Sequence, residues 1–127
     1  MFYLTKIENS RMPVPEPEYL DVGTSAIKAG ATLALSSGKL VLNTTAPTHI
    51  AAADYAANAT NVPVYRITKD QIYEVPCSAT PSAFTAGTKL ALKSDGLEVA
   101  AVSDSGLVTI VSVNGAKAIG DTVLVRF

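Results

Sequence analysis

Hydrophobic and polar residues alternate with a period of two along most of the chain from Tyr19 onward. This period is typical of β-strands that turn one face toward a core and the other toward solvent. The alternation predicts strands at residues 33–35, 39–42, 64–68, 72–75, 89–92, 97–102, 107–113 and 122–127. Clusters of Gly, Asn, Asp and Ser separate these segments, and such residues favour tight turns between paired strands. We therefore expect an all-β fold, either a small antiparallel barrel or a two-sheet sandwich.

Part of this pattern is repeated, since residues 29–38 and residues 86–96 both read as Ala-Gly, an alternating strand and a turn. Each copy is preceded by a strand-like segment that contains Tyr, an acid and Val, at residues 18–22 and 71–75. Repetition of this kind indicates repeated structural units. We therefore expect residues 19–127 to form a single β domain built from two similar half-units.

Residues 48–59 are rich in alanine and fit two interpretations. Alanine favours helix, and the segment is long enough for about two to three helical turns. It lacks the apolar stripe of an amphipathic helix, however, and Val62 and Pro63 restart an extended segment. We favour a strand over residues 48–53 followed by a loop, with a helix as the alternative.

The N-terminal region, residues 1–18, has a different pattern. Proline occupies every second position over residues 13–17, which removes backbone donors and biases the preceding residues to extended angles. This predicts an extended arm of polyproline character in front of the β domain. The apolar residues 2–4 favour an arm that lies on a partner surface, and a frayed terminus is the alternative.

Composition limits the classes of partner. The 127 residues include ten basic and eleven acidic side chains, and neither sign is concentrated in one block. A broad electrostatic attraction to nucleic acid or to an anionic membrane is therefore not expected. No apolar run approaches the roughly 18 residues needed to span a bilayer. We expect a protein that is made in a cytoplasm, stays soluble and binds neither nucleic acid nor membrane.

Reactive chemistry is sparse in this sequence. The lone Cys77 has no second cysteine with which to form an intramolecular disulfide or a zinc site. The lone His49 has no Gly-x-Ser-x-Gly motif beside it and reads more simply as a residue that hydrogen-bonds locally. The aspartates are dispersed, mostly beside turns, and lack the spacing of a calcium loop. We therefore expect no catalytic residue, no metal site and no cofactor, and a protein that is not an enzyme.

Two segments near the C-terminus are unusually apolar. Residues 107–113 are apolar on both faces, which a strand at a solvent-facing edge could not sustain. The last strand, residues 122–127, also carries large apolar side chains. These strands are either central in the core or covered by another subunit of a homo-oligomer. The candidate residues of a subunit interface are Val108, Ile110, Val125 and Phe127.

A family resemblance is carried by residues 14–20, 47–54, 62–67, 72–75 and 120–127. Together they look like small head proteins of tailed bacteriophages, the capsid decoration or head-fibre-base proteins. The similarity covers most of the chain from residue 11 onward, and its motifs are structural rather than catalytic. It implies a β-rich virion protein on the outer surface of the capsid. Such a protein binds the major capsid protein, often as a homotrimer, and stabilises the shell or displays further domains.

In a protein of that kind the arm would provide the capsid contact. The candidate capsid-binding residues are Phe2, Tyr3, Leu4, Arg11, Pro13, Pro15 and Pro17. The alternative is a carbohydrate- or cell-surface-binding β module of a phage fibre or tail. Such modules stack sugars on aromatic side chains, and the chain has no tryptophan. This alternative therefore depends on the tyrosines at positions 19, 55, 65 and 73.

Overall fold

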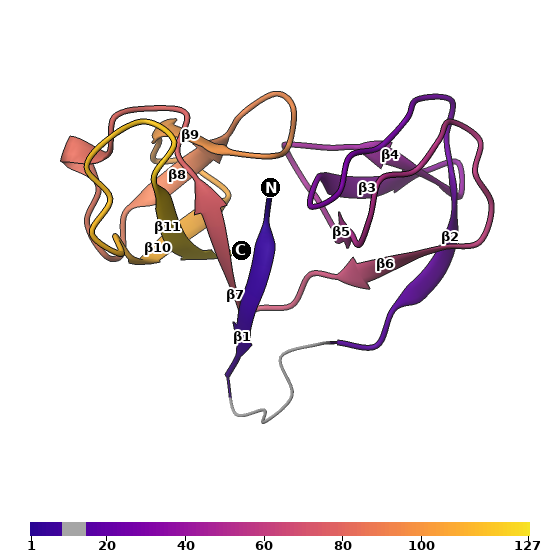
Figure 1. Ribbon diagram of the computed structural model, residues 1–127, viewed down its shortest axis with the longest axis horizontal. Coiled ribbons are helices and arrows are strands. Elements are labelled where there is room, and N and C mark those ends of the chain that lie inside the picture. Colours follow the sequence, from indigo (N-terminus) through magenta and orange to yellow (C-terminus); the bar gives the residue numbers. More distant parts are fainter. Residues whose placement is uncertain (9–14) are drawn as a thin grey trace.

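The computed structural model describes residues 1–8 and 15–127, and it confirms the all-β fold. The strands are β1 (Tyr3–Ile7), β2 (Glu18–Val22), β3 (Thr32–Ser36), β4 (Lys39–Leu42), β5 (His49–Ala51), β6 (Val62–Arg66), β7 (Gln71–Pro76), β8 (Lys89–Leu92), β9 (Val99–Val102), β10 (Val108–Ser112) and β11 (Thr122–Arg126). A short 3₁₀ helix, η1, spans Pro81–Ala83. The strands form two modules that lie beside each other, with β1 between them (Figure 1).

The first module is a closed barrel with the strand order β2-β4-β3-β5-β6. β2 closes it by pairing antiparallel with β6 on one side and parallel with β4 on the other. Inward-facing aliphatic residues fill its interior, among them the fully buried Val22, Leu33, Leu40 and Val64. His49–Ala51 of β5 form a strand, which confirms the strand interpretation of this region over the helical one.

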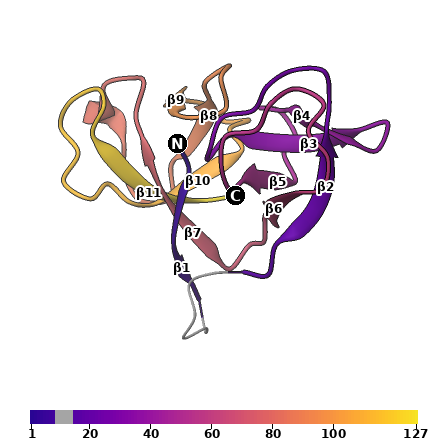
Figure 2. The ribbon, with the colours of Figure 1, turned by 45° about the vertical axis from the view of Figure 1, so that its right-hand side comes forward.

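The second module is a six-stranded sheet with the order β1-β7-β11-β10-β8-β9. It has its own cluster of buried apolar side chains, and Ile50 is the one described residue of the first module in that cluster. The expected β domain thus contains two modules, each with a separate core. The view in Figure 2 shows the sheet curling on one side and the barrel on the other.

The two modules share one topology, which confirms the two similar half-units. Read around the barrel, the order β4-β3-β5-β6-β2 matches the order β9-β8-β10-β11-β7 in the second sheet. Equivalent hydrogen bonds recur, since the Gly23 amide donates to the Leu40 carbonyl at 2.9 Å and the Ser78 amide donates to the Val99 carbonyl at 2.8 Å. A parallel bridge between Cys77 and Val99 replaces the β2–β4 pairing of the barrel.

The start of the chain departs from the expected arm. Over Tyr3–Ile7 it forms β1, which pairs antiparallel with β7 and places Leu4 opposite Tyr73. Phe2 is buried, and its ring lies 5.3 Å from that of Phe127 and 6.0 Å from that of Tyr73. An arm outside the β domain is therefore wrong for this part of residues 1–18, because its apolar side chains complete the second core.

The strands proposed for a subunit interface are instead central in the second module. β10 lies between β11 and β8, and Val108, Ile110 and Val125 are buried within the chain's own core. Phe127 packs against Phe2 and Tyr73. The alternative interpretation, burial in the core, therefore holds for these residues. Their apolar pattern on both faces reflects a central strand position rather than a subunit contact.

Candidate binding pocket between the two modules

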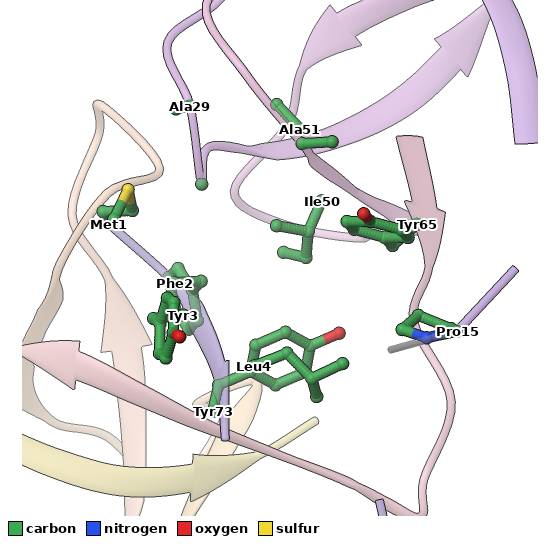
Figure 3. A pocket seen from close by; sticks show the side chains of 12 residues that line it. Met1, Phe2, Tyr3, Leu4, Pro15, Ala29, Ile50, Ala51, Tyr65 and Tyr73 are labelled. Carbon is green, nitrogen blue, oxygen red and sulfur yellow. The ribbon is translucent and has the colours of Figure 1, made fainter. Parts of the chain in front are cut away.

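An apolar pocket opens where β1 meets the barrel (Figure 3). Its volume is about 400 Å³, within the range of sites that bind small molecules or side chains. Its walls come from both modules: Met1, Phe2, Tyr3, Leu4, Pro15, Ala29, Gly30, Ile50, Ala51, Ala52, Tyr65 and Tyr73. Among these described residues none carries a charged side chain, so the pocket favours an uncharged occupant.

The close approach of β1 to the barrel depends on Gly30. The Phe2 amide donates to the Gly30 carbonyl at 3.0 Å, across the junction between the modules. Gly30 has a φ of +72°, in the left-handed region that favours glycine. A Cβ at this position would lie 2.1 Å from Met1 Cγ, so no larger residue fits without moving the start of the chain.

A second contact between the modules joins β3 to the turn before β9. The Thr32 amide donates to the Gly96 carbonyl at 3.1 Å. Gly96 has a φ of +68°, and a Cβ there would lie 2.6 Å from Thr32 Oγ1. Together with Ile50, which joins the second core, these contacts hold the pocket walls in place.

Tyr73 forms the floor of the pocket and is held from below. Its hydroxyl donates to Gln71 Oε1 at 2.6 Å, and Gln71 in turn accepts from the Thr68 amide and donates to the Arg66 carbonyl. Burial raises the pKa of Tyr73 strongly, and the charge of Asp70 raises it further. The raised pKa keeps the phenol neutral at neutral pH, so the floor of the pocket is uncharged there.

The strand edges beside the pocket are protected against pairing with another strand. β1 lies at the end of its sheet, but its register shifts between Leu4 and Lys6, and Lys6 is exposed. A bulge and an edge lysine are both features that disfavour the addition of a further strand. β1 is thus suited to present side chains rather than a backbone edge.

In the other module, proline removes one donor beside β2. In β2 the Val22 amide points to the β6 side, whereas the Gly23 amide points to β4. Because amide directions alternate along an extended chain, the nitrogen of Pro17 lies on the same side as the Gly23 amide. Among the described residues of β2, only Asp21 and Val22 pair with β4, so the chain before Asp21 has no strand partner on this side. Proline at position 17 removes the donor that would otherwise be exposed there.

A polar network lies away from the pocket, on the barrel. His49 is buried, and its Nε2 lies 2.8 Å from Glu18 Oε2 while its Nδ1 lies 2.8 Å from Thr48 Oγ1. Glu18 also accepts from Arg66 Nε at 2.6 Å. The hydrogen bonds from Arg66, and then from His49, hold the pKa of Glu18 below its usual range. The network ties β2, β5 and β6 together at the seam of the barrel.

This network has the hydroxyl, imidazole and carboxylate of a nucleophilic relay, which the sequence did not suggest. Glu18 is 31 positions from His49, so no local motif marks the pair. The exposed Thr48 and the buried His49 do not line the pocket between the modules, however. A relay needs a cleft beside its nucleophile, and the geometry therefore fits a structural role.

Among the described residues, the cysteine and the possible metal ligands do not form a reactive site either. Cys77 is buried, and desolvation, followed by the charges of Asp121 and Glu98, raises the pKa of its thiol. A raised pKa keeps the sulfur protonated and weakly nucleophilic. Over residues 1–8 and 15–127, no group of three or more His, Cys, Asp or Glu side chains is placed to hold a metal ion.

The four tyrosines proposed for a sugar-binding surface do not form one surface. Tyr19 is exposed on β2, whereas Tyr55 is half-buried and donates its hydroxyl to the Pro63 carbonyl at 2.5 Å. Tyr65 and Tyr73 line the pocket. Of the proposed arm residues, Phe2, Tyr3, Leu4 and Pro15 also line it, whereas Arg11 and Pro13 lie outside the described residues.

Comparison with protein-family models, curated proteins and solved structures finds no match to this chain. In the part of the chain that the structure describes, no helix has the length and apolar character required to cross a membrane. The sequence did not reveal the pocket residues 29, 30 and 50–52, because these small and aliphatic side chains become a site only when β1 packs beside them.

Proposed function

We propose that this chain is a structural protein of a tailed-phage virion that binds the outer face of the capsid, where it decorates or cements the shell and serves as a base for head fibres. The observation that carries the proposal is the pocket at the junction of the two modules, whose described lining residues have no charged side chain and include the exposed apolar residues Met1 and Tyr3. Exposed apolar groups around a concavity are typical of protein-binding surfaces. The resemblance to phage decoration proteins supports the same function.

Several acidic side chains accept hydrogen bonds from backbone amides, which supports a structural role for them rather than a reactive one. Asp21 accepts from the Asn61 amide at 2.9 Å, and Asp95 accepts from the Leu97 amide at 3.0 Å. Asp121 accepts from the amides of residues 117 and 118, which lower the pKa of its carboxyl. Asp95 and Asp121 stabilise local turns, and Asp21 holds the segment that leads into β6. Acidic side chains that shape loops fit a protein that works by binding.

Binding by a preformed β surface would act as follows. Two modules fixed by the Gly30 and Gly96 contacts lose little conformational freedom when they dock, so less of the contact energy is spent on ordering. The partner is the major capsid protein, and the binding unit is a homotrimer. Many copies on one head then act in parallel, so a weak individual contact still yields a stable layer. In this proposal the protein is made in the bacterial host cytoplasm and functions on the virion surface.

The test uses phage heads that lack this protein. Purified protein is added to them, and bound protein and heat-induced genome release are measured. Binding with a higher release temperature is the expected result. Protein that neither co-sediments with the heads nor changes the release temperature would refute the cementing function.

The exposure of Tyr19 and Tyr3 favours one alternative function, a carbohydrate- or cell-surface-binding module. Exposed aromatic rings can stack on sugars. A glycan array distinguishes the two functions, because glycan binding that is lost in both Tyr19→Ala and Tyr3→Ala would favour the alternative. Head binding without any glycan signal would favour the capsid function.

A further inference from the structure

The pocket between the modules has the properties of a binding site for one side chain of a partner protein. We propose that it receives a single large uncharged side chain, aromatic or aliphatic, from an extended segment of the capsid protein. This inference rests on the proposed function and specifies how the partner is held. The argument depends on the pocket's charge, on its hydrogen-bonding groups and on the neighbouring strand edges.

The charge of the lining limits the occupant. Ile50, Leu4 and Phe2 provide apolar walls, and no charged side chain is present among the lining residues that the structure describes. The α-ammonium of Met1 donates to the Leu97 carbonyl, and a charged group placed among the apolar side chains would lose its hydration. The complementary partner is therefore uncharged at this point.

The backbone groups of the lining are largely used within the chain. The Gly30 amide donates to the Ala51 carbonyl, and the Gly30 carbonyl accepts from Phe2. The Ala29 amide donates to Asp54 Oδ1 at 2.7 Å. An occupant would gain affinity from apolar burial and from the rings of Tyr65 and Tyr73 rather than from backbone hydrogen bonds (Figure 3).

The neighbouring edges disfavour the other common way of binding an extended segment. Addition of a strand needs a regular edge with free backbone donors. The bulge and Lys6 disfavour such pairing at β1, and Pro17 removes a donor beside β2. The partner segment is thus held by an inserted side chain and not by a new strand.

The first experiment tests the pocket without reference to the capsid. Two blocked peptides, acetyl-Ala-Ala-Phe-Ala-Ala-amide and the same peptide with Asp in place of Phe, are titrated into ¹⁵N,¹³C-labelled protein. Saturable NMR shifts that cluster at Ile50, Ala51 and Leu4, with the Phe peptide at least tenfold tighter, are expected. Equal shifts with both peptides, or shifts elsewhere on the surface, would overturn the proposal.

The second experiment connects the pocket to the heads. Ala52→Trp fills the pocket from its rim, and the matched control Ala53→Trp places the same side chain at the next, exposed position, outside the lining. Ala52→Trp is expected to weaken both peptide and head binding at least tenfold, whereas Ala53→Trp leaves both unchanged. Circular dichroism and thermal melting verify that both variants fold.

The outcomes separate this inference from the proposed function. If Ala52→Trp binds heads as well as Ala53→Trp does, the capsid contact lies elsewhere: the pocket proposal fails and the capsid function stands. If the wild-type protein binds the Phe peptide but no heads, the capsid is not the partner and both fail. A variant with residues 9–14 replaced by Gly and Ser tests a rival occupant. A tenfold gain in peptide affinity there would identify the chain's own segment as the competitor and overturn the proposal.

Discussion

The Glu18 carboxylate and the buried Nε2 of His49 lie 2.8 Å apart at the seam where β2 meets the rest of the barrel. His49 is enclosed, so its ring nitrogens depend on Glu18 and Thr48 for their hydrogen bonds. A buried polar group that loses its partner destabilises the fold by more than the hydrogen bond itself contributes. The pair therefore links β2 to β5, the strand that lies on the other side of β6.

Glu18→Gln is expected to lower the free energy of unfolding by about 1 kcal/mol, because a neutral amide replaces a charge-assisted hydrogen bond to His49. The exposed Arg66 contact adds little, since solvent screens it. Urea denaturation followed by circular dichroism measures the change. Glu16→Gln is the matched control, because Glu16 is exposed and lies just before the strand. An equal effect in both variants would contradict a specific role for the Glu18–His49 pair.

Acid should weaken the same seam. Hydrogen bonds from Arg66 and His49 lower the pKa of Glu18 below its ordinary value of 4.5. A carboxyl with a lowered pKa in the folded state stabilises the protein above its unfolded pKa, and this stabilisation is lost as the pH falls through the folded value. The difference in stability between wild type and Glu18→Gln should therefore shrink as the pH falls below about 5. Urea titrations at several pH values below about 5 test this, and a difference that grows as the pH falls through this range would contradict it.

Much of the fold could be predicted from period-two alternation, because each strand faces a core on one side. The pairing of β1 could not be predicted in this way, because the burial of Phe2 and Leu4 depends on β7, which lies far along the chain. The prolines after β1 suggested an independent arm, whereas Pro17 lies beside β2 and removes a donor from its open side. Local pattern cannot show which of these roles a proline serves.

The repeat illustrates the same limit at the level of register. In the sequence repeat, Val22 is equivalent to Val75. The hydrogen bonds of the two modules instead make Gly23 equivalent to Ser78, and therefore Val22 equivalent to Cys77. A shift of two residues leaves the same side chains facing inward, so alternation cannot distinguish the two registers. The candidate site was less predictable than the fold, because the pocket and the Glu18–His49 pair both depend on contacts between distant segments.

The junction between the modules can be tested with two glycines that have similar backbone angles. Gly30→Ala and Gly38→Ala each force a residue with a Cβ into the left-handed region, at φ values of +72° and +77°, which costs about 1 kcal/mol. Only the Gly30 variant also meets Met1, whereas a Cβ at Gly38 has no atom within 4 Å among the described neighbours. Gly30→Ala should therefore be the less stable variant by at least about 1 kcal/mol. Equal urea midpoints would show that the contact between β1 and the barrel contributes little.

Phe2 and Tyr3 provide a direct test of β1 as part of the core rather than an arm. Phe2 is 3% exposed and packs against Tyr73 and Phe127, whereas Tyr3 is 61% exposed. Phe2→Ala should lower the free energy of unfolding by about 3 to 5 kcal/mol, because it leaves a cavity in the second module. Tyr3→Ala should change it by no more than about 0.5 kcal/mol, as expected for an exposed position. Chemical denaturation measures both. A Phe2→Ala variant as stable as wild type would mean that the second module folds without β1, and the free arm would then be the better description.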